Sequence, residues 1–95
     1  MQLSFRNGAL GAARRTLADL GRGEISTVIG IELPHDLANR LMELGFLPGS
    51  SVLAAFSAPS GDPRVFRVEG AEIALRRETA LHILIAPEPN GLAAA

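Results

Sequence analysis

The stretch RVFRVEGAEIALR, residues 64–76, decides the fold class. Apolar residues occupy every second position on both sides of the Gly70-Ala71 pair. A period of two is typical of a strand with one buried face, and a Gly-X link of two residues is typical of a type II′ hairpin. The stretch therefore predicts two antiparallel strands, 64–69 and 72–76, joined by a tight turn.

The same period of two extends the sheet in both directions along the chain. It recurs at 51–58 and, with apolar or β-branched residues at the odd positions, at 25–33. A turn-forming loop, 59–63, separates 51–58 from the hairpin, and 83–85 adds a last short strand. The pattern predicts five strands that close on a core of Ile29, Ile31, Phe56, Phe66, Val68, Ile73 and Leu75.

One short helix is expected after the first of these strands, over residues 36–44. Asp36 follows a strand-ending proline and is expected to be the N-cap. Leu37, Leu41 and Leu44 recur at helical spacing, so their face is expected to cover one open end of the sheet.

The end of this helix is marked by Gly45, which fits the left-handed C′ position. Phe46 is then expected to fold back on Leu41, as in a Schellman motif. Pro48 and Gly49 fill the central positions of a type II turn over 47–50. Two more helical turns are expected. One is at 77–82, and the other begins at Thr16, where the spacing of Thr16 and Asp19 resembles a capping box and Gly21 and Gly23 end the turn.

These elements predict a mainly β fold, a small and strongly bent antiparallel barrel of about five strands with one inserted helix. A chain of 95 residues has the size of a single domain. We expect a loose N-terminal extension over 1–15, the barrel over 16–87, and a flexible tail over 88–95.

Composition limits the classes of function. The chain has no cysteine and no lysine, and its longest apolar run, 52–56, is far too short to span a bilayer. Residues 1–23 carry a charge of +3 and residues 24–95 a charge of −4. An acidic body argues against a dedicated nucleic-acid binder, and a start without a signal peptide predicts a cytoplasmic protein.

Catalytic chemistry has weak support in the sequence. His35 and His82 are the only histidines, and neither belongs to a recognisable motif. Glu32, His35 and Asp36 are close enough in sequence to suggest an iron site, but a surface histidine beside a helix is the simpler interpretation. We expect no catalytic residues, no cofactor site and no metal site.

Three motifs in order resemble the FeoA family: LMELGFLPGS at 41–50, APSGDP at 58–63 and VEGAEIALRR at 68–77. TLADLGRGE at 16–24 is similar to the start of that family, while Ser60 departs from its usual leucine. The resemblance implies an SH3-like barrel without enzymatic activity. It also implies a cytosolic accessory of ferrous iron uptake that binds and modulates FeoB, a permease with a GTP-binding domain.

Two alternatives stay open beside this interpretation. A related barrel forms the C-terminal module of iron-responsive repressors, so a freestanding regulatory or nucleic-acid-binding barrel is the competing class. A weak homo-oligomer is the other association that the sequence leaves open. Contact with a membrane is expected only through the permease.

The partner-binding surface is expected around the helix exit. Met42, Phe46 and Leu47 are the apolar residues that the core pattern claims least clearly, and Ser60 and Arg64 belong to a loop expected to lie beside them. Phe46 has an alternative role in the helix cap.

Overall fold

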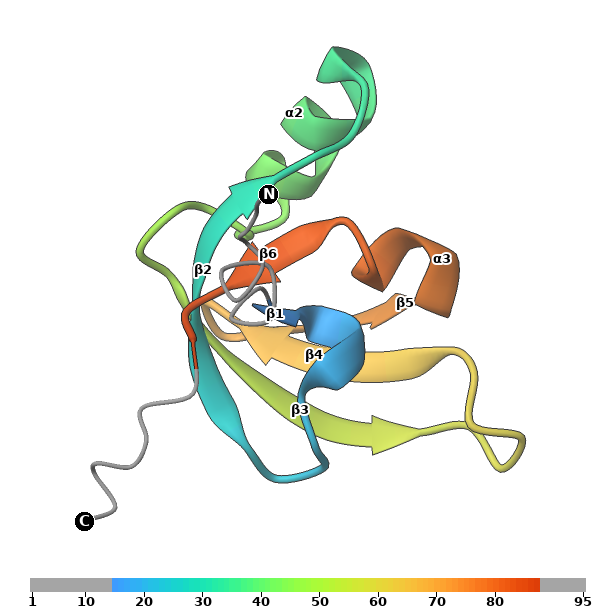
Figure 1. The fold of residues 1–95 in the computed structure, drawn as a ribbon. Coiled ribbons are helices and arrows are strands. Elements are labelled where there is room, and N and C mark those ends of the chain that lie inside the picture. Colours follow the sequence, from blue (N-terminus) through green and yellow to red (C-terminus); the bar gives the residue numbers. More distant parts are fainter. Residues whose placement is uncertain (1–14, 88–95) are drawn as a thin grey trace, which may run out of the picture.

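An antiparallel sheet of six strands forms the frame of the protein in the computed structural model, which describes residues 15–87 (Figure 1). The strand order is β1-β6-β2-β3-β4-β5. The strands are β1 (Arg15–Thr16), β2 (Ile25–Ile31), β3 (Ser51–Ser57), β4 (Arg64–Val68), β5 (Ala71–Leu75) and β6 (Ile83–Ile85). The predicted mainly β fold is confirmed, and the two-residue strand β1 is an addition to it.

The expected N-terminal extension, apart from Arg15, and the expected tail over 88–95 lie outside the described residues. Arg15 itself pairs with Ile85, because β1 runs antiparallel to β6.

Three helical segments connect the strands: η1 (Leu17–Asp19), α2 (His35–Glu43) and α3 (Arg77–Ala80). The predicted capping box begins η1. The Thr16 N–H donates to Asp19 Oδ2 at 3.0 Å, and the Ala18 N–H donates to Thr16 Oγ1 at 3.2 Å. Both bonds satisfy N–H groups that the short helix leaves unpaired. In the described part of the chain, no helix has the length and apolarity needed to cross a bilayer.

The core lies inside the bend of the sheet and draws on every described strand except β1. Phe66, Val68 and Leu75 are buried as predicted, while Ile31 and Ile73 are partly buried against the cluster. Its other members are Leu17, Leu20, Val28, Leu41, Phe46, Val52, Ala54, Ala80, Ile83 and Ile85.

The predicted buried face of β2 is wrong. Ile29 is 52% exposed and Ile25 67%, whereas Val28 is fully buried. Val28 pairs with Ile85 and Gly30 with Leu84, so Ile29 is an extra residue in a bulge. Positions 25, 27 and 29 lie on the exposed side of the strand, and Val28 lies on the buried side. The bulge then brings the next odd residue, Ile31, to the partly buried side.

A second bulge turns Phe56 out of the core, where the sequence had placed it. Ala54 pairs with Phe66, but Phe56 pairs with Val65, which leaves Ala55 without an opposite residue. Val65 alternates with Phe66 and faces outward, and directly opposite residues share a face. Phe56 is accordingly 46% exposed.

The β4–β5 hairpin has the predicted two-residue link, shifted by one position. Val68 pairs with Ala71, so the link is Glu69-Gly70 rather than Gly70-Ala71. Both link residues have positive φ, 50° for Glu69 and 81° for Gly70. Two positive φ values identify a type I′ turn, not the expected type II′.

The beginning of α2 differs from the expectation. Pro34 is the N-cap, with an extended backbone and no side-chain cap, and the helix begins at His35. Asp36 therefore lies in the first turn, where its charge still favours the positive end of the helix dipole.

The end of α2 is the predicted Schellman motif. The Gly45 N–H donates to the Met42 carbonyl at 3.0 Å, and the Phe46 N–H donates to the Leu41 carbonyl at 3.1 Å. Gly45 has φ 118°, the left-handed conformation that glycine adopts at least cost. The turn that follows is closed by the Ser50 N–H, which donates to the Leu47 carbonyl at 2.8 Å.

Candidate functional site

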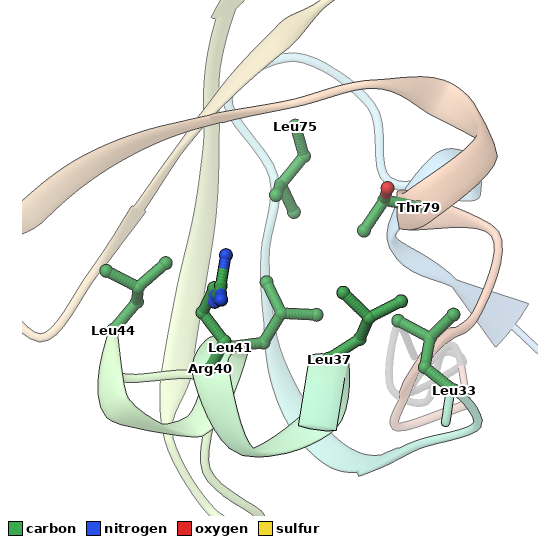
Figure 2. Close-up of a pocket in the computed structure, with 7 residues that line it drawn as sticks. All are labelled: Leu33, Leu37, Arg40, Leu41, Leu44, Leu75 and Thr79. Atoms are coloured by element: carbon green, nitrogen blue, oxygen red, sulfur yellow. The ribbon is translucent and has the colours of Figure 1, made fainter. Parts of the chain in front are cut away.

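An open apolar groove of about 220 Å³ lies between α2 and the wall made by β5 and α3 (Figure 2). We call it the α2 groove. Its lining residues are Leu33, Leu37, Arg40, Leu41, Leu44, Leu75 and Thr79.

The leucine spacing of α2 produces one wall of the groove. Leu41 is 7% exposed and anchors the helix in the core, but Leu37 and Leu44 are 46% and 44% exposed. Figure 1 shows why, because α2 projects beyond the end of the sheet instead of lying flat on it. The expectation that the leucine face covers an open end is therefore wrong for two of its three leucines.

The opposite wall depends on the loop between β3 and β4. The Arg77 N–H, at the start of α3, donates to Asp62 Oδ1 at 2.8 Å, and Asp62 Oδ2 lies 3.8 Å from the Arg76 guanidinium. This contact holds α3 against the loop, and α3 in turn carries Thr79. Leu75, at the end of β5, completes the wall and is buried.

The electrostatics of the α2 groove are simple. Of the described residues that line it, Arg40 alone is charged, and Thr79 alone brings a hydroxyl group. Figure 2 shows the Arg40 side chain extending from α2 into the space below Leu75. The groove therefore offers extensive apolar contact and one cation, a combination suited to binding an amphipathic partner.

The structure separates the residues that were expected to meet a partner. Phe46 is fully buried in the core cluster beside the helix cap, so it offers no surface to a partner in this conformation. Met42 is partly buried, and Leu47 is 45% exposed beside the helix exit.

Ser60 and Arg64 do not lie next to the helix exit. Leu47 comes before the start of β3 and Ser60 after its end, and a seven-residue strand spans about 23 Å. Arg64 instead lies near the core, with Cζ 5.3 Å from the centroid of the Phe66 ring. The five expected residues therefore do not form one surface.

Sequence reasoning missed the α2 groove although its signal was present. The leucine stripe of α2 predicts a core face, and no motif marks Leu33, Arg40 or Thr79 as partner contacts. Nothing local in the sequence indicates how far a helix stands from its sheet.

The two histidines are exposed and lie outside the α2 groove. Across residues 15–87, no group of three or more His, Cys, Asp or Glu side chains is arranged to hold a metal ion.

Comparison with known proteins identifies the family. The model of the FeoA domain matches residues 15–87. A curated relative from Porphyromonas gingivalis, an Fe(2+) transport protein A/Fe(2+) transporter FeoB fusion protein, is 30% identical over 67 residues. The match covers 70% of this chain but only 8% of that much longer protein.

Two solved structures share the fold. The FeoA protein of Chlorobium tepidum has a TM-score of 0.72 at 27% identity, with 77% of this chain and 70% of that chain covered. The zinc-complexed FeoA of Stenotrophomonas maltophilia has a TM-score of 0.68 at 29% identity, with 75% and 88% covered. It is described as an SH3 domain protein suggested to activate ferrous iron transport, so the SH3-like architecture is confirmed. The chain belongs to the FeoA domain family.

Proposed function

We propose that this protein is a cytoplasmic accessory of ferrous iron uptake that binds an FeoB-type permease and modulates it. The observation that carries the proposal is the Porphyromonas gingivalis relative, in which protein A and FeoB are parts of one polypeptide. Fusion keeps two domains at a high effective concentration, which is useful when they act on each other. The description of the Stenotrophomonas maltophilia protein supports the same role.

The groove geometry supports a role in binding. Half-exposed leucines facing an apolar wall bury more surface when a partner covers them, and that burial favours association. The GTP-binding domain of the permease, or another cytoplasmic part of it, is the partner in this proposal. The protein reaches the membrane only through that contact.

Retention of the permease by the chain tests the proposal. The chain carries an affinity tag and is mixed with the full permease in detergent, with its isolated GTP-binding domain, and with duplex DNA. We expect saturable retention of the permease. A tagged chain that retains no permease, or that binds DNA with a strong salt dependence, contradicts the proposal and favours a regulatory barrel.

A further inference from the structure

We infer that the α2 groove binds an amphipathic helix of the permease that places a carboxylate beside Arg40. The inference rests on the proposed function and assigns its contact surface.

The shape of the groove fits a helix. Leu37, Leu41 and Leu44 follow each other at intervals of four and three residues, the spacing by which one helix packs along another. They span two turns of α2, about 10 Å. Leu75 and Thr79 face them across the groove, and Leu33 lies beside Leu37 (Figure 2). An apolar stripe of two or three turns on the partner fills this space, in the manner of helix-in-groove recognition.

The charge of Arg40 indicates which polar group the partner helix carries beside its apolar stripe. Arg40 stands one turn after Asp36 and one turn before Leu44, in the middle of the leucines. Among the described residues it has no ion pair and no side-chain hydrogen bond, Asp36 included. Arg40 is exposed in the free chain, and a partner that covers it excludes water. The local dielectric then falls, which strengthens the attraction between its guanidinium and a carboxylate. A partner helix with Asp or Glu at the edge of its apolar stripe is therefore favoured.

The position of Arg40 also disfavours a second copy of this chain as the occupant. An isologous pair formed through the middle of the leucine stripe places that middle of each α2 helix at the two-fold axis. Arg40 lies at that centre, so each Arg40 faces its equivalent. Like charges opposed in an apolar contact oppose association.

Matched double variants test the inference with the detergent-solubilised permease as the probe. The groove variant is Leu37→Asp with Leu44→Asp, and the control is Met42→Asp with Leu47→Asp at the helix exit. We expect the groove variant to bind at least about 30-fold more weakly, and the control to bind within about threefold of the parent. A parent-like melting curve is required of each variant.

Two variants of Arg40 measure how much its charge contributes to binding. Arg40→Glu is expected to weaken binding about tenfold or more, while Arg40→Lys, which keeps the charge, stays within about threefold. Equal binding by the Glu and Lys variants contradicts the proposed contact between Arg40 and a carboxylate of the partner.

A cross-link identifies the occupant directly. The chain has no native cysteine, so Leu37→Cys takes a single photoreactive label. Cross-links to a permease helix that contains Asp or Glu support the inference, and cross-links to any other segment contradict it. Sedimentation of the parent and of the groove variant tests for a second copy of the chain as the occupant. A parent dimer that is absent in the groove variant would identify a second copy and contradict the inference.

Failure of the inference is distinguishable from failure of the function. If the parent binds the permease and the groove variant binds it equally well, the groove assignment alone is overturned. A parent that does not bind the permease overturns the proposed function, and the groove assignment with it.

Discussion

Asp62 Oδ1 accepts a hydrogen bond at 2.8 Å from the backbone N–H of Arg77, fifteen residues further along the chain. The first N–H groups of a helix have no partner within it, and Arg76, the N-cap of α3, provides no side-chain cap. Asp62 supplies that cap from the β3–β4 loop. The APSGDP and LRR motifs are therefore two halves of one contact, which positions a wall of the α2 groove.

Removal of this remote cap is expected to destabilise the protein. Asp62→Ala loses the bond to Arg77 and is expected to lower the free energy of unfolding by about 1 kcal/mol, the usual value of a helix cap. Asp62→Asn keeps an oxygen acceptor and is expected to lose less. Urea denaturation measures both, and an Asp62→Ala curve that superimposes on the parent curve contradicts the capping role.

Two phenylalanines distinguish the inner and outer faces of the sheet. Phe66 is fully buried, so Phe66→Ala is expected to cost about 3 to 5 kcal/mol of unfolding free energy. Phe56 is 46% exposed, and Phe56→Ala is expected to cost far less. The comparison is made by thermal and urea unfolding. Equal losses at the two positions would contradict the outward position of Phe56.

A side chain at Gly45 is expected to destabilise the protein. Its φ is 118°, and a Cβ there lies 3.2 Å from the Cβ and Cγ atoms of Glu69. Gly45→Ala is therefore expected to lower the free energy of unfolding by about 1 kcal/mol or more. Gly30→Ala is the control, because a Cβ at Gly30 has no atom within 4 Å and its φ is not positive. A smaller loss at Gly45 than at Gly30 is the contrary result.

Local chemistry explains which features the sequence predicts well. The capping box at Thr16, the Schellman motif at Gly45 and the turn at Pro48-Gly49 each depend on a few adjacent residues. All three are visible in the sequence, and all three form in the structure.

Register explains what the sequence misses. The alternation of apolar residues in β2 and β3 looks continuous, but β2 faces the core with Val28, an even position, and a bulge in β3 changes the face of the residues after Ala54. The buried face and the bulge are both set by pairing with distant strands, so Ile29 and Phe56 cannot be placed from their neighbours alone. The α2 groove is hidden for the same reason, since the exposure of Leu37 and Leu44 depends on the tilt of α2 against β5.

Ferrous iron is expected not to bind the isolated chain at a stoichiometric micromolar site. The chain has no cysteine and only two histidines, 47 positions apart in the sequence. Anaerobic titration with Fe(II) is the measurement. Saturable binding of one Fe(II) per chain that disappears in His35→Ala would contradict the prediction.

Fe(II) uptake by cells tests the central claim most directly. Cells that express the permease but lack this chain are given the parent gene, the Leu37→Asp and Leu44→Asp double variant, or the Met42→Asp and Leu47→Asp double variant, at matched protein levels. The account predicts that the parent and the helix-exit variant restore uptake and that the groove variant does not. Uptake that is unchanged by loss of the chain, or fully restored by the groove variant, contradicts it.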